Sequence, residues 1–175
     1  MKQFEFTLAF RLADFSVPMD LRLERLAEAR CDDALAGIGH PGQIALAFSR
    51  EGQSARDAVL SALTDVRTAL PDARLIEASP DLVGLTDVAE IMGFTRQNMR
   101  KLMIGSAGPT PAPLHGGKPS LWHLAHVLRW LRDGRSYPVD PDLLELAEVT
   151  MQLNIAADGA NADAGVQREI RAALQ

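Results

Sequence analysis

The clearest constraint on the fold is an alternation of apolar and polar residues near the start of the chain. Between residues 4 and 12, large apolar side chains occupy every second position, as Phe4, Phe6, Leu8, Phe10 and Leu12. The side chains between them are Glu5, Thr7, Ala9 and Arg11. Because successive side chains of a β-strand point to opposite faces of its sheet, this spacing predicts a strand with one buried face.

The residues that follow predict alternating helices and strands over the first eighty positions. A helix is indicated by the apolar spacing of Leu23, Leu26, Ala27 and Cys31. Residues 34–39 and 43–49 are typical of two strands joined by a turn at His40-Pro41-Gly42. A second helix with Ser54 as its N-cap carries the stripe Val59, Leu63, Val66 and Leu70, and residues 74–78 form a last strand. The order β-α-β-β-α-β predicts an α+β fold with a ferredoxin-like domain over residues 1–80.

The open face of that predicted sheet has small side chains. On strand 43–49 the residues Ile44, Leu46 and Phe48 share one face, which leaves Ala45 and Ala47 on the other. A related RNA-binding module stacks bases on aromatic side chains of its open sheet face, and such side chains are missing here. Small side chains suit close contact with another sheet or a small ligand, and they are equally compatible with a solvated face.

Charge is distributed unevenly along the chain. The net charge of the 175 residues is −5, but residues 82–137 hold seven basic and three acidic residues, a net charge of +4. Residues 1–81 carry a net charge of −4 and residues 138–175 one of −5. A basic segment between acidic ones is typical of a nucleic-acid-binding region, although windows of this length also vary by a few charges by chance.

Within the basic segment, residues 85–104 have the pattern of two helices joined by a glycine turn. Thr86 would cap the first helix, Gly93 suits the left-handed conformation at its end, and Thr95 would cap the second helix. The inward face of the second helix consists of Met99, Leu102 and Met103, and its outward face of Arg96, Gln97, Asn98, Arg100 and Lys101. A helix-turn-helix places such outward side chains in the major groove, where arginine pairs with guanine and amides pair with adenine.

The stretch LTDVAEIMGFTRQNMRKLM resembles the winged helix-turn-helix of MerR-like and excisionase-like DNA-binding proteins. That family has a short first helix, a turn with a hydrophobic residue and glycine, a Ser/Thr-Arg-Gln start to the recognition helix, and a proline-rich wing. Here Pro109-Thr110-Pro111-Ala112-Pro113 precedes the expected wing at residues 114–120. Ser120 would then cap a helix that contains Trp122 and Trp130. The resemblance covers about residues 82–134.

The resemblance implies a sequence-specific DNA-binding regulator of transcription, with the binding domain over residues 82–137. The recognition helix would start at Thr95, and His115 and Lys118 of the wing would contact the DNA backbone or the minor groove. Residues 1–80 would serve dimerisation, sensing or partner binding. We expect a homodimer on double-stranded DNA, because one short helix reads few bases whereas a two-fold pair reads two half-sites. The alternative is an antitoxin-like or phage-type accessory protein whose acidic ends bind a basic protein partner.

The last part of the chain predicts one further helix and a tail. Asp140-Pro141 is a cap followed by proline in the first helical position. The apolar stripe of this helix, expected over residues 138–157, is Leu143, Leu144, Ala147, Met151 and Ile155. We expect it to pack on another element or on a second subunit. Residues 158–175 are expected to form a flexible tail, in which residues 166–175 can adopt a marginal helix.

Other functions find little support in the sequence. The chain has no phosphate-binding loop, dinucleotide-binding glycine motif, zinc-protease motif or nucleophile elbow, so we expect neither enzymatic activity nor a cofactor. His123 and His126 have a spacing that can reach one metal ion, but two histidines without further ligands are a weak indication. An enzyme remains the third hypothesis, and it would require a polar pocket lined by His40 with Asp32 or Asp33.

The cellular location is constrained by cysteine content and hydropathy. The single cysteine, Cys31, excludes an intrachain disulfide, and we expect it to be a small buried apolar residue. No apolar run approaches the ~20 residues that span a bilayer. The first residues lack the layout of a signal peptide. These features predict a cytoplasmic protein without a membrane partner.

Overall fold

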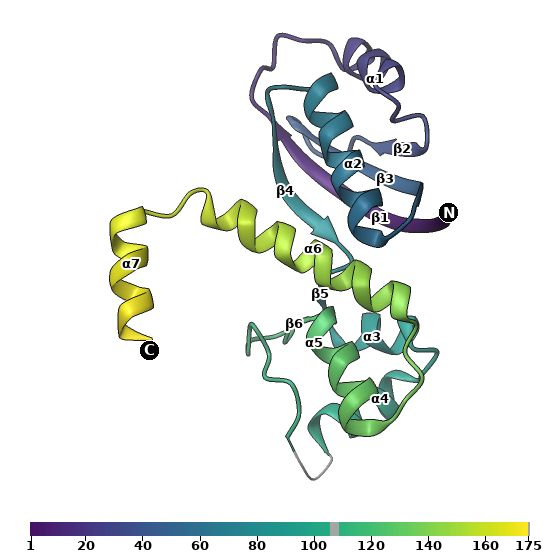
Figure 1. Cartoon of the computed structure of the whole chain (residues 1–175), viewed down its shortest axis with the longest axis vertical. Helices are drawn as coiled ribbons and strands as arrows, with labels where there is room; N and C mark the ends of the chain where they lie inside the picture. Colours follow the sequence, from purple (N-terminus) through teal and green to yellow (C-terminus); the bar gives the residue numbers. More distant parts are fainter. Residues whose placement is uncertain (106–108, 175) are drawn as a thin grey trace.

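The computed structural model describes residues 1–105 and 109–174, and it is a mixed α+β structure with an antiparallel sheet. Figure 1 shows two lobes, one built around the sheet and one built mainly of helices, with a long helix lying between them. The first lobe contains β1 (Lys2–Leu12), α1 (Met19–Glu28), β2 (Ala34–Gly37), β3 (Gln43–Gly52), α2 (Ala55–Ala69) and β4 (Ala73–Ser79). The predicted order of strands and helices in residues 1–80 is therefore observed.

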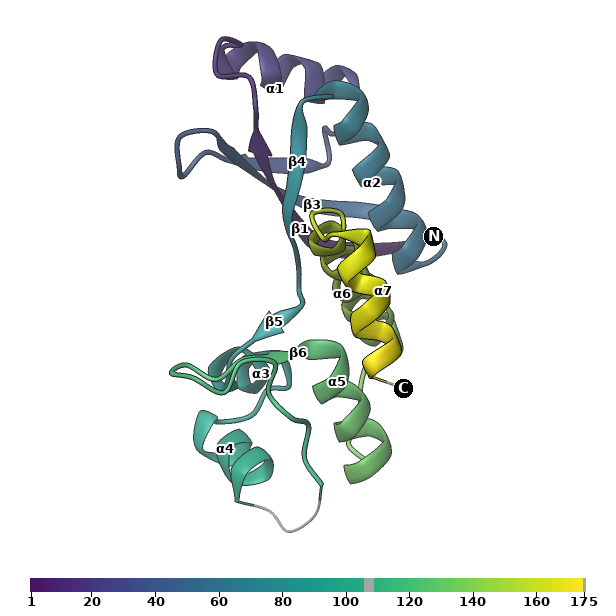
Figure 2. The ribbon, with the colours of Figure 1, turned by 90° about the vertical axis from the view of Figure 1, so that its left-hand side faces the viewer.

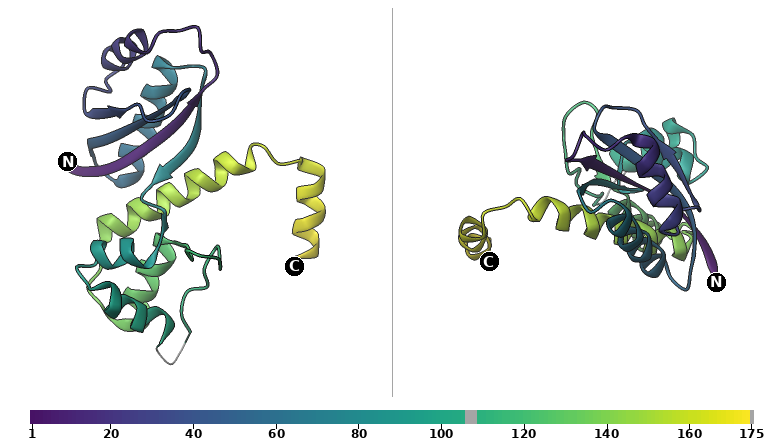
Figure 3. Two further views of the ribbon diagram at one scale, coloured as in Figure 1. Left: turned by 180° about the vertical axis from the view of Figure 1, so that it is seen from behind. Right: turned by 90° about the horizontal axis from the view of Figure 1, so that it is seen from above.

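The sheet of the first lobe has the strand order β2-β3-β1-β4, and each neighbouring pair is antiparallel. The alternating apolar residues of β1 all face the core, and Phe6 stacks on Phe48 of β3 with ring centroids 5.3 Å apart. Helices α1 and α2 cover this face (Figure 3). Ser54 caps α2 as predicted, because its side chain accepts a hydrogen bond from the backbone N–H of Asp57.

Helix α1 differs from its predicted pattern in two residues. Ala27 is exposed, whereas Arg22, which the apolar spacing did not include, is buried with 1% of its surface accessible. The Arg22 guanidinium donates to both carboxylate oxygens of Asp72, at 3.0 Å each, and to the backbone carbonyl of Asp14. The hydrogen bonds from Arg22 lower the pKa of Asp72 to about 2. A paired arginine thus joins α1 to the turn before β4.

The second lobe has its own apolar core. Its elements are β5 (Leu82–Val83), α3 (Leu85–Ile91), α4 (Arg96–Ile104), β6 (Trp122–His123), α5 (Leu124–Arg129) and a π-helical turn, η1 (Trp130–Gly134). Strands β5 and β6 pair antiparallel, which brings the start of this lobe beside the residues that precede α5. The core gathers residues from every helix of this lobe, among them Val88, Met99, Trp122, Leu124 and Leu128.

Two of the predicted caps in this lobe are wrong. The first helix begins two residues earlier than the Thr86 cap requires, with Gly84 as its N-cap, because the Asp87 carboxylate accepts from the Gly84 N–H at 2.7 Å. Ser120 does not cap α5, which begins at Leu124 after His123. The Ser120 hydroxyl instead donates to the Gly117 carbonyl inside the preceding hairpin.

Helix α6 (Pro141–Gly159) contributes to the cores of both lobes (Figure 2). Leu146 packs in the first core, while Leu144, Ala147 and Met151 pack in the second. Its start agrees with prediction, since the Asp140 side chain accepts from the Asp142 N–H and Pro141 occupies the first turn. The helix extends to Gly159, two residues past the predicted helical range. Its packing partners are therefore the two lobes of the same chain.

The segment expected as a tail contains helix α7 (Ala164–Ala173), capped by Asp163. Figures 1 and 3 show α7 projecting away from the lobes, and none of its residues is buried. Among the helices of the described residues, none has both the length and the apolar character needed to cross a membrane.

A buried polar junction joins the lobes where β4 leads into β5. Asp81, with 1% of its surface accessible, contacts His123 Nδ1 and accepts from Asn154 Nδ2, both at 2.7 Å. Asn154 of α6 also bonds the backbone N–H and carbonyl of Ala78. The Thr150 hydroxyl donates to the Pro80 carbonyl at 2.6 Å. Side chains of α6 thus bond to Ala78, Pro80 and Asp81, where the chain passes from the first lobe to the second.

Candidate nucleic-acid interface

The turn between α3 and α4 has the geometry that its sequence predicts. Gly93 has a φ of 66°, in the left-handed region that glycine adopts without steric cost. The next residue, Phe94, donates its N–H to the Ala89 carbonyl at 2.7 Å, which closes the end of α3. Thr95 is the N-cap of α4, with its hydroxyl oxygen accepting from the Asn98 N–H at 3.1 Å. The two helices therefore meet at a short turn whose conformation is set by local contacts.

Helix α4 presents one apolar and one polar face. Met99 and Met103 are buried in the second core, and Leu102 is half-buried. The predicted outward residues are all exposed, namely Thr95, Arg96, Gln97, Asn98, Arg100 and Lys101. The packing that fixes α4 thus uses none of the side chains predicted to contact DNA.

The predicted wing is a short hairpin held by backbone hydrogen bonds between its two ends. Leu114 and His115 both donate their N–H to the Leu121 carbonyl, and the Leu121 N–H donates to the His115 carbonyl. At its tip the His115 ring lies against Gly117, where an added Cβ would be 2.2 Å from His115 Nε2. His115 and Lys118 are both exposed.

Both tryptophans anchor the proline-rich stretch that leads into this hairpin. The indole N–H of Trp122 donates to the Pro111 carbonyl at 3.1 Å, and that of Trp130 donates to the Pro109 carbonyl at 2.9 Å. Proline has no N–H to offer, so these carbonyls are the polar groups by which the stretch is attached. This role of the two indole groups depends on how the stretch folds back and was not predicted from the sequence.

A groove of about 680 Å³ separates α4 from the hairpin. Arg96 and Arg100 line it from α4, and Lys118 lines it from the hairpin. The other residues predicted to contact DNA do not line the groove, namely Thr95, Gln97, Asn98, Lys101 and His115. One carboxylate, Asp87, also borders the groove, but it accepts the hydrogen bond from Gly84 that begins α3. The structure therefore brings three cations from two separate elements to one concave surface.

The cations of the basic segment divide into two groups according to their partners. Arg129 pairs with Glu148, Arg132 pairs with Asp133, and Arg135 lies over the Trp130 ring. Within residues 1–105 and 109–174, no ion pair involves Arg96, Arg100, Lys101 or Lys118. The positive charge that is free to attract an anion is thus concentrated on α4 and the hairpin.

The two histidines considered as metal ligands are His123, at the end of β6, and His126 of α5. His123 Nδ1 is engaged by Asp81, and the rings of His123 and His126 are 5.3 Å apart in an edge-to-face arrangement. Burial lowers the pKa of His126, and the neighbouring His123 adds to this effect. In the part of the chain that the structure describes, no group of three or more ligating side chains is positioned to hold a metal ion.

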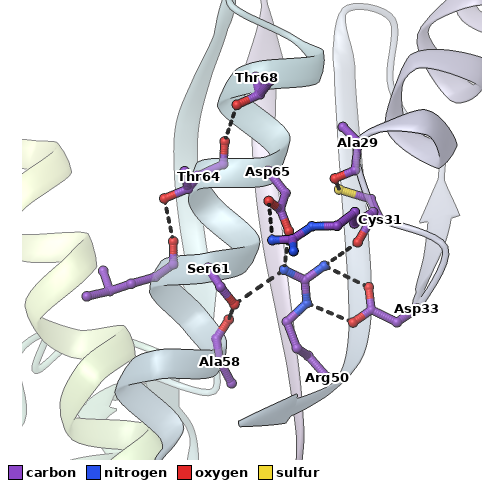
Figure 4. A network of polar contacts seen from close by, with 11 residues as sticks. Ala29, Cys31, Asp33, Arg50, Ala58, Ser61, Thr64, Asp65 and Thr68 are labelled. Carbon is purple, nitrogen blue, oxygen red and sulfur yellow. Dashed lines mark hydrogen bonds and ion pairs between the residues drawn. The ribbon is translucent and has the colours of Figure 1, made fainter.

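The polar residues considered for catalysis are separated or used in structural contacts. His40 lies exposed in the turn between β2 and β3, apart from the shallow pocket that Asp32 and Asp33 border. Figure 4 shows that Asp33 is bound instead to Arg50, which also reaches Asp65 of α2 and lies near Cys31. Burial raises the pKa of the Cys31 thiol to about 11. The thiol is therefore protonated near neutral pH and is a poor nucleophile.

Comparison of the chain with protein-family models, with curated proteins and with solved structures gave no match.

Proposed function

We propose that the protein is a sequence-specific DNA-binding regulator of transcription. In this proposal residues 82–137 form a winged helix-turn-helix similar to that of MerR-like and excisionase-like proteins, and residues 1–80 form a ferredoxin-like domain. The observation that carries the proposal is the convergence of Arg96, Arg100 and Lys118 on one groove, without a carboxylate partner among the described residues. An exposed groove lined by three cations and one carboxylate, with no ion pair to these cations among the described residues, is suited to the phosphates of a duplex.

Helix α4 has suitable dimensions and side chains for the major groove. An α-helix with its side chains is about 10–12 Å across, which fits a major groove about 12 Å wide. Arg96 and Gln97 occupy the first turn, which is the part of a recognition helix that meets base edges. Arginine matches the O6 and N7 acceptors of guanine, and glutamine matches the N6 and N7 groups of adenine. Arg100 and Lys101, one turn later, are placed for phosphate contacts that orient the helix.

The acidic parts of the chain limit where the duplex can lie. The net charge of residues 1–81 is −4 and that of residues 138–175 is −5, and both repel phosphate. A duplex on the groove between α4 and the hairpin approaches the second lobe, whose own net charge is positive. Repulsion from the remaining surface then lowers non-specific affinity, which is mainly electrostatic.

The proposal predicts that changing Arg96 and Gln97 to alanine removes sequence discrimination. Each good base contact contributes about 1–3 kcal/mol to discrimination, so the double variant is expected to lose most of the preference for its best site. The measurement is fluorescence anisotropy, with a fragment selected from genomic DNA compared with an unrelated duplex. Arg67→Ala, at an exposed position on α2, is the matched control and should leave discrimination intact. Unchanged discrimination in the double variant would show that α4 does not read bases.

Lys118→Ala is expected to weaken binding to every duplex by a similar factor. A lysine that contacts phosphate releases a counterion on binding, so the slope of log affinity against log salt should become shallower by about one. Titrations of the selected and unrelated fragments at several salt concentrations measure both effects. An effect confined to the selected fragment would mean that the hairpin contacts bases, contrary to its assignment as a phosphate-binding wing.

A further inference from the structure

The face of the sheet opposite α1 and α2 is uncovered by any described element of the chain (Figure 3). Its centre consists of Thr7 and Ala9 on β1 and of Ala45 and Ala47 on β3, which pair with them directly. The small size of these side chains leaves a hollow of about 490 Å³ beside Thr7, Ala47 and Ser79. Because the side chains at the centre are short, the backbone of another sheet can approach this face closely.

Apolar side chains border this centre without a partner. Leu35 of β2 pairs with Ala47 and is 78% exposed, and Ile38, just beyond β2, is 53% exposed. On the opposite edge Ile76 of β4 is 41% exposed. Exposed large apolar residues on both sides of a flat patch are typical of a surface that another protein covers.

The charges on this face are arranged so that it complements a second copy of itself. On β1, Glu5 lies three residues before Leu8 and Arg11 lies three residues after it, both exposed. On β4, Arg74 lies beside Arg11 and the exposed Glu77 lies beside Ala9, so this end of the face carries two arginines and one glutamate. In the described structure neither Glu5 nor Arg11 takes part in an ion pair.

A two-fold axis between two such sheets, crossing the strands at the level of Leu8, reverses the direction of the partner strand. Each Glu5 then faces Arg11 of the second copy, about 10 Å from the axis on either side. Thr7 and Ala47 of one copy face Ala9 and Ala45 of the other. An axis parallel to the strands would instead place like charges together.

We propose that the protein forms a homodimer through this open sheet face, with paired Glu5–Arg11 contacts between the copies. The expectation of a dimer comes from the proposed function, whereas the choice of surface depends only on the sheet. The partner is therefore a second copy of this chain, not a nucleic acid or an unrelated protein.

The test is a charge exchange followed by sedimentation equilibrium of the full chain without DNA. Arg11→Glu and Glu5→Arg alone each create two like-charge contacts and should raise the dimer dissociation constant at least about tenfold. The variant with both changes restores opposite charges and should return to within about threefold of the original value. Circular dichroism of all three variants verifies that the fold is retained.

Two outcomes would overturn this assignment. One is an original chain that remains monomeric at micromolar concentration, and the other is a dimer that neither single change weakens. Arg96→Ala combined with Gln97→Ala should leave the dimer unchanged, since both residues lie on α4 in the other lobe. A failure of DNA recognition is thereby distinguished from a failure of the dimer surface.

Discussion

Replacement of Arg50 by alanine is expected to lower the free energy of unfolding by about 3–5 kcal/mol. Arg50 of β3 is 7% exposed, and its guanidinium donates to Asp33 at 2.7 and 2.9 Å and to Asp65 at 2.7 Å (Figure 4). It also donates to the Arg30 carbonyl and lies over the Phe48 ring. Removing it leaves Asp33 without an ion-pair partner among the described residues, and it leaves Asp65 with only the exposed Arg30.

Urea unfolding followed by circular dichroism measures this loss directly. Arg25→Ala on α1 is a matched control, because Arg25 is exposed and should change the free energy of unfolding by less than about 0.5 kcal/mol. Arg50→Lys should fall between the two, since a single ammonium group cannot donate to both carboxylates in the way that a guanidinium does. A cost for Arg50→Ala as small as that of the control would show that Asp33 and Asp65 are well solvated without their partner.

The regular part of this fold could be predicted because its physical cause is local. The alternation along β1 and the caps at Ser54, Thr95 and Asp140 depend on neighbouring residues alone, and the structure confirms each of them. The outward residues of α4 were predictable for the same reason, since helical spacing determines which side chains a core can take. Their role in binding DNA stays a prediction.

Features that depend on contacts between distant residues could not be predicted. Arg22 reads as a surface residue until the structure places Asp72, fifty positions later, beside its guanidinium. Ser120 has the side chain of a good cap, but residues 121–123 continue the hairpin and β6, so α5 begins only at Leu124. The apolar stripe predicted for α6 omitted Leu146, which packs in the first core, and included Ile155, which is 51% exposed. Only the positions of the two lobes separate Leu146 from Ala147.

The convergence of Arg96, Arg100 and Lys118 lies between these cases. Each residue was singled out from the local pattern, but their common groove depends on how the hairpin folds back beside α4. The same holds for the other arginines of the basic segment, whose partners Glu148 and Asp133 come from different positions in the chain. The net charge of residues 82–137 therefore overstates how many of their cations can bind an anion. The cations of α4 and the hairpin are the ones that have no ion pair among the described residues.

Asp81→Ala is expected to weaken the coupling between the two lobes and to lower the free energy of unfolding by about 2–4 kcal/mol. The buried carboxylate is the shared partner of His123 in the second lobe and of Asn154 on α6. Without it, the His123 ring nitrogen loses its contact, and Asn154 keeps only its bonds to Ala78. The connection between β4 and β5 then keeps the hydrogen bond from the Thr150 hydroxyl to Pro80 and the backbone bond from Leu124 to the residue 81 carbonyl.

The two tryptophans of the chain make this uncoupling measurable, because Trp122 and Trp130 both belong to the second lobe. Tryptophan fluorescence reports on that lobe, whereas far-ultraviolet circular dichroism reports on the whole chain. The two urea transitions should coincide for the original protein and separate for Asp81→Ala. Asp142→Ala is the matched control, since Asp142 of α6 also contacts the first lobe, through Lys2. That ion pair is exposed to solvent and is expected to contribute little. Coincident transitions with an unchanged midpoint in Asp81→Ala would mean that apolar packing of α6 alone couples the lobes.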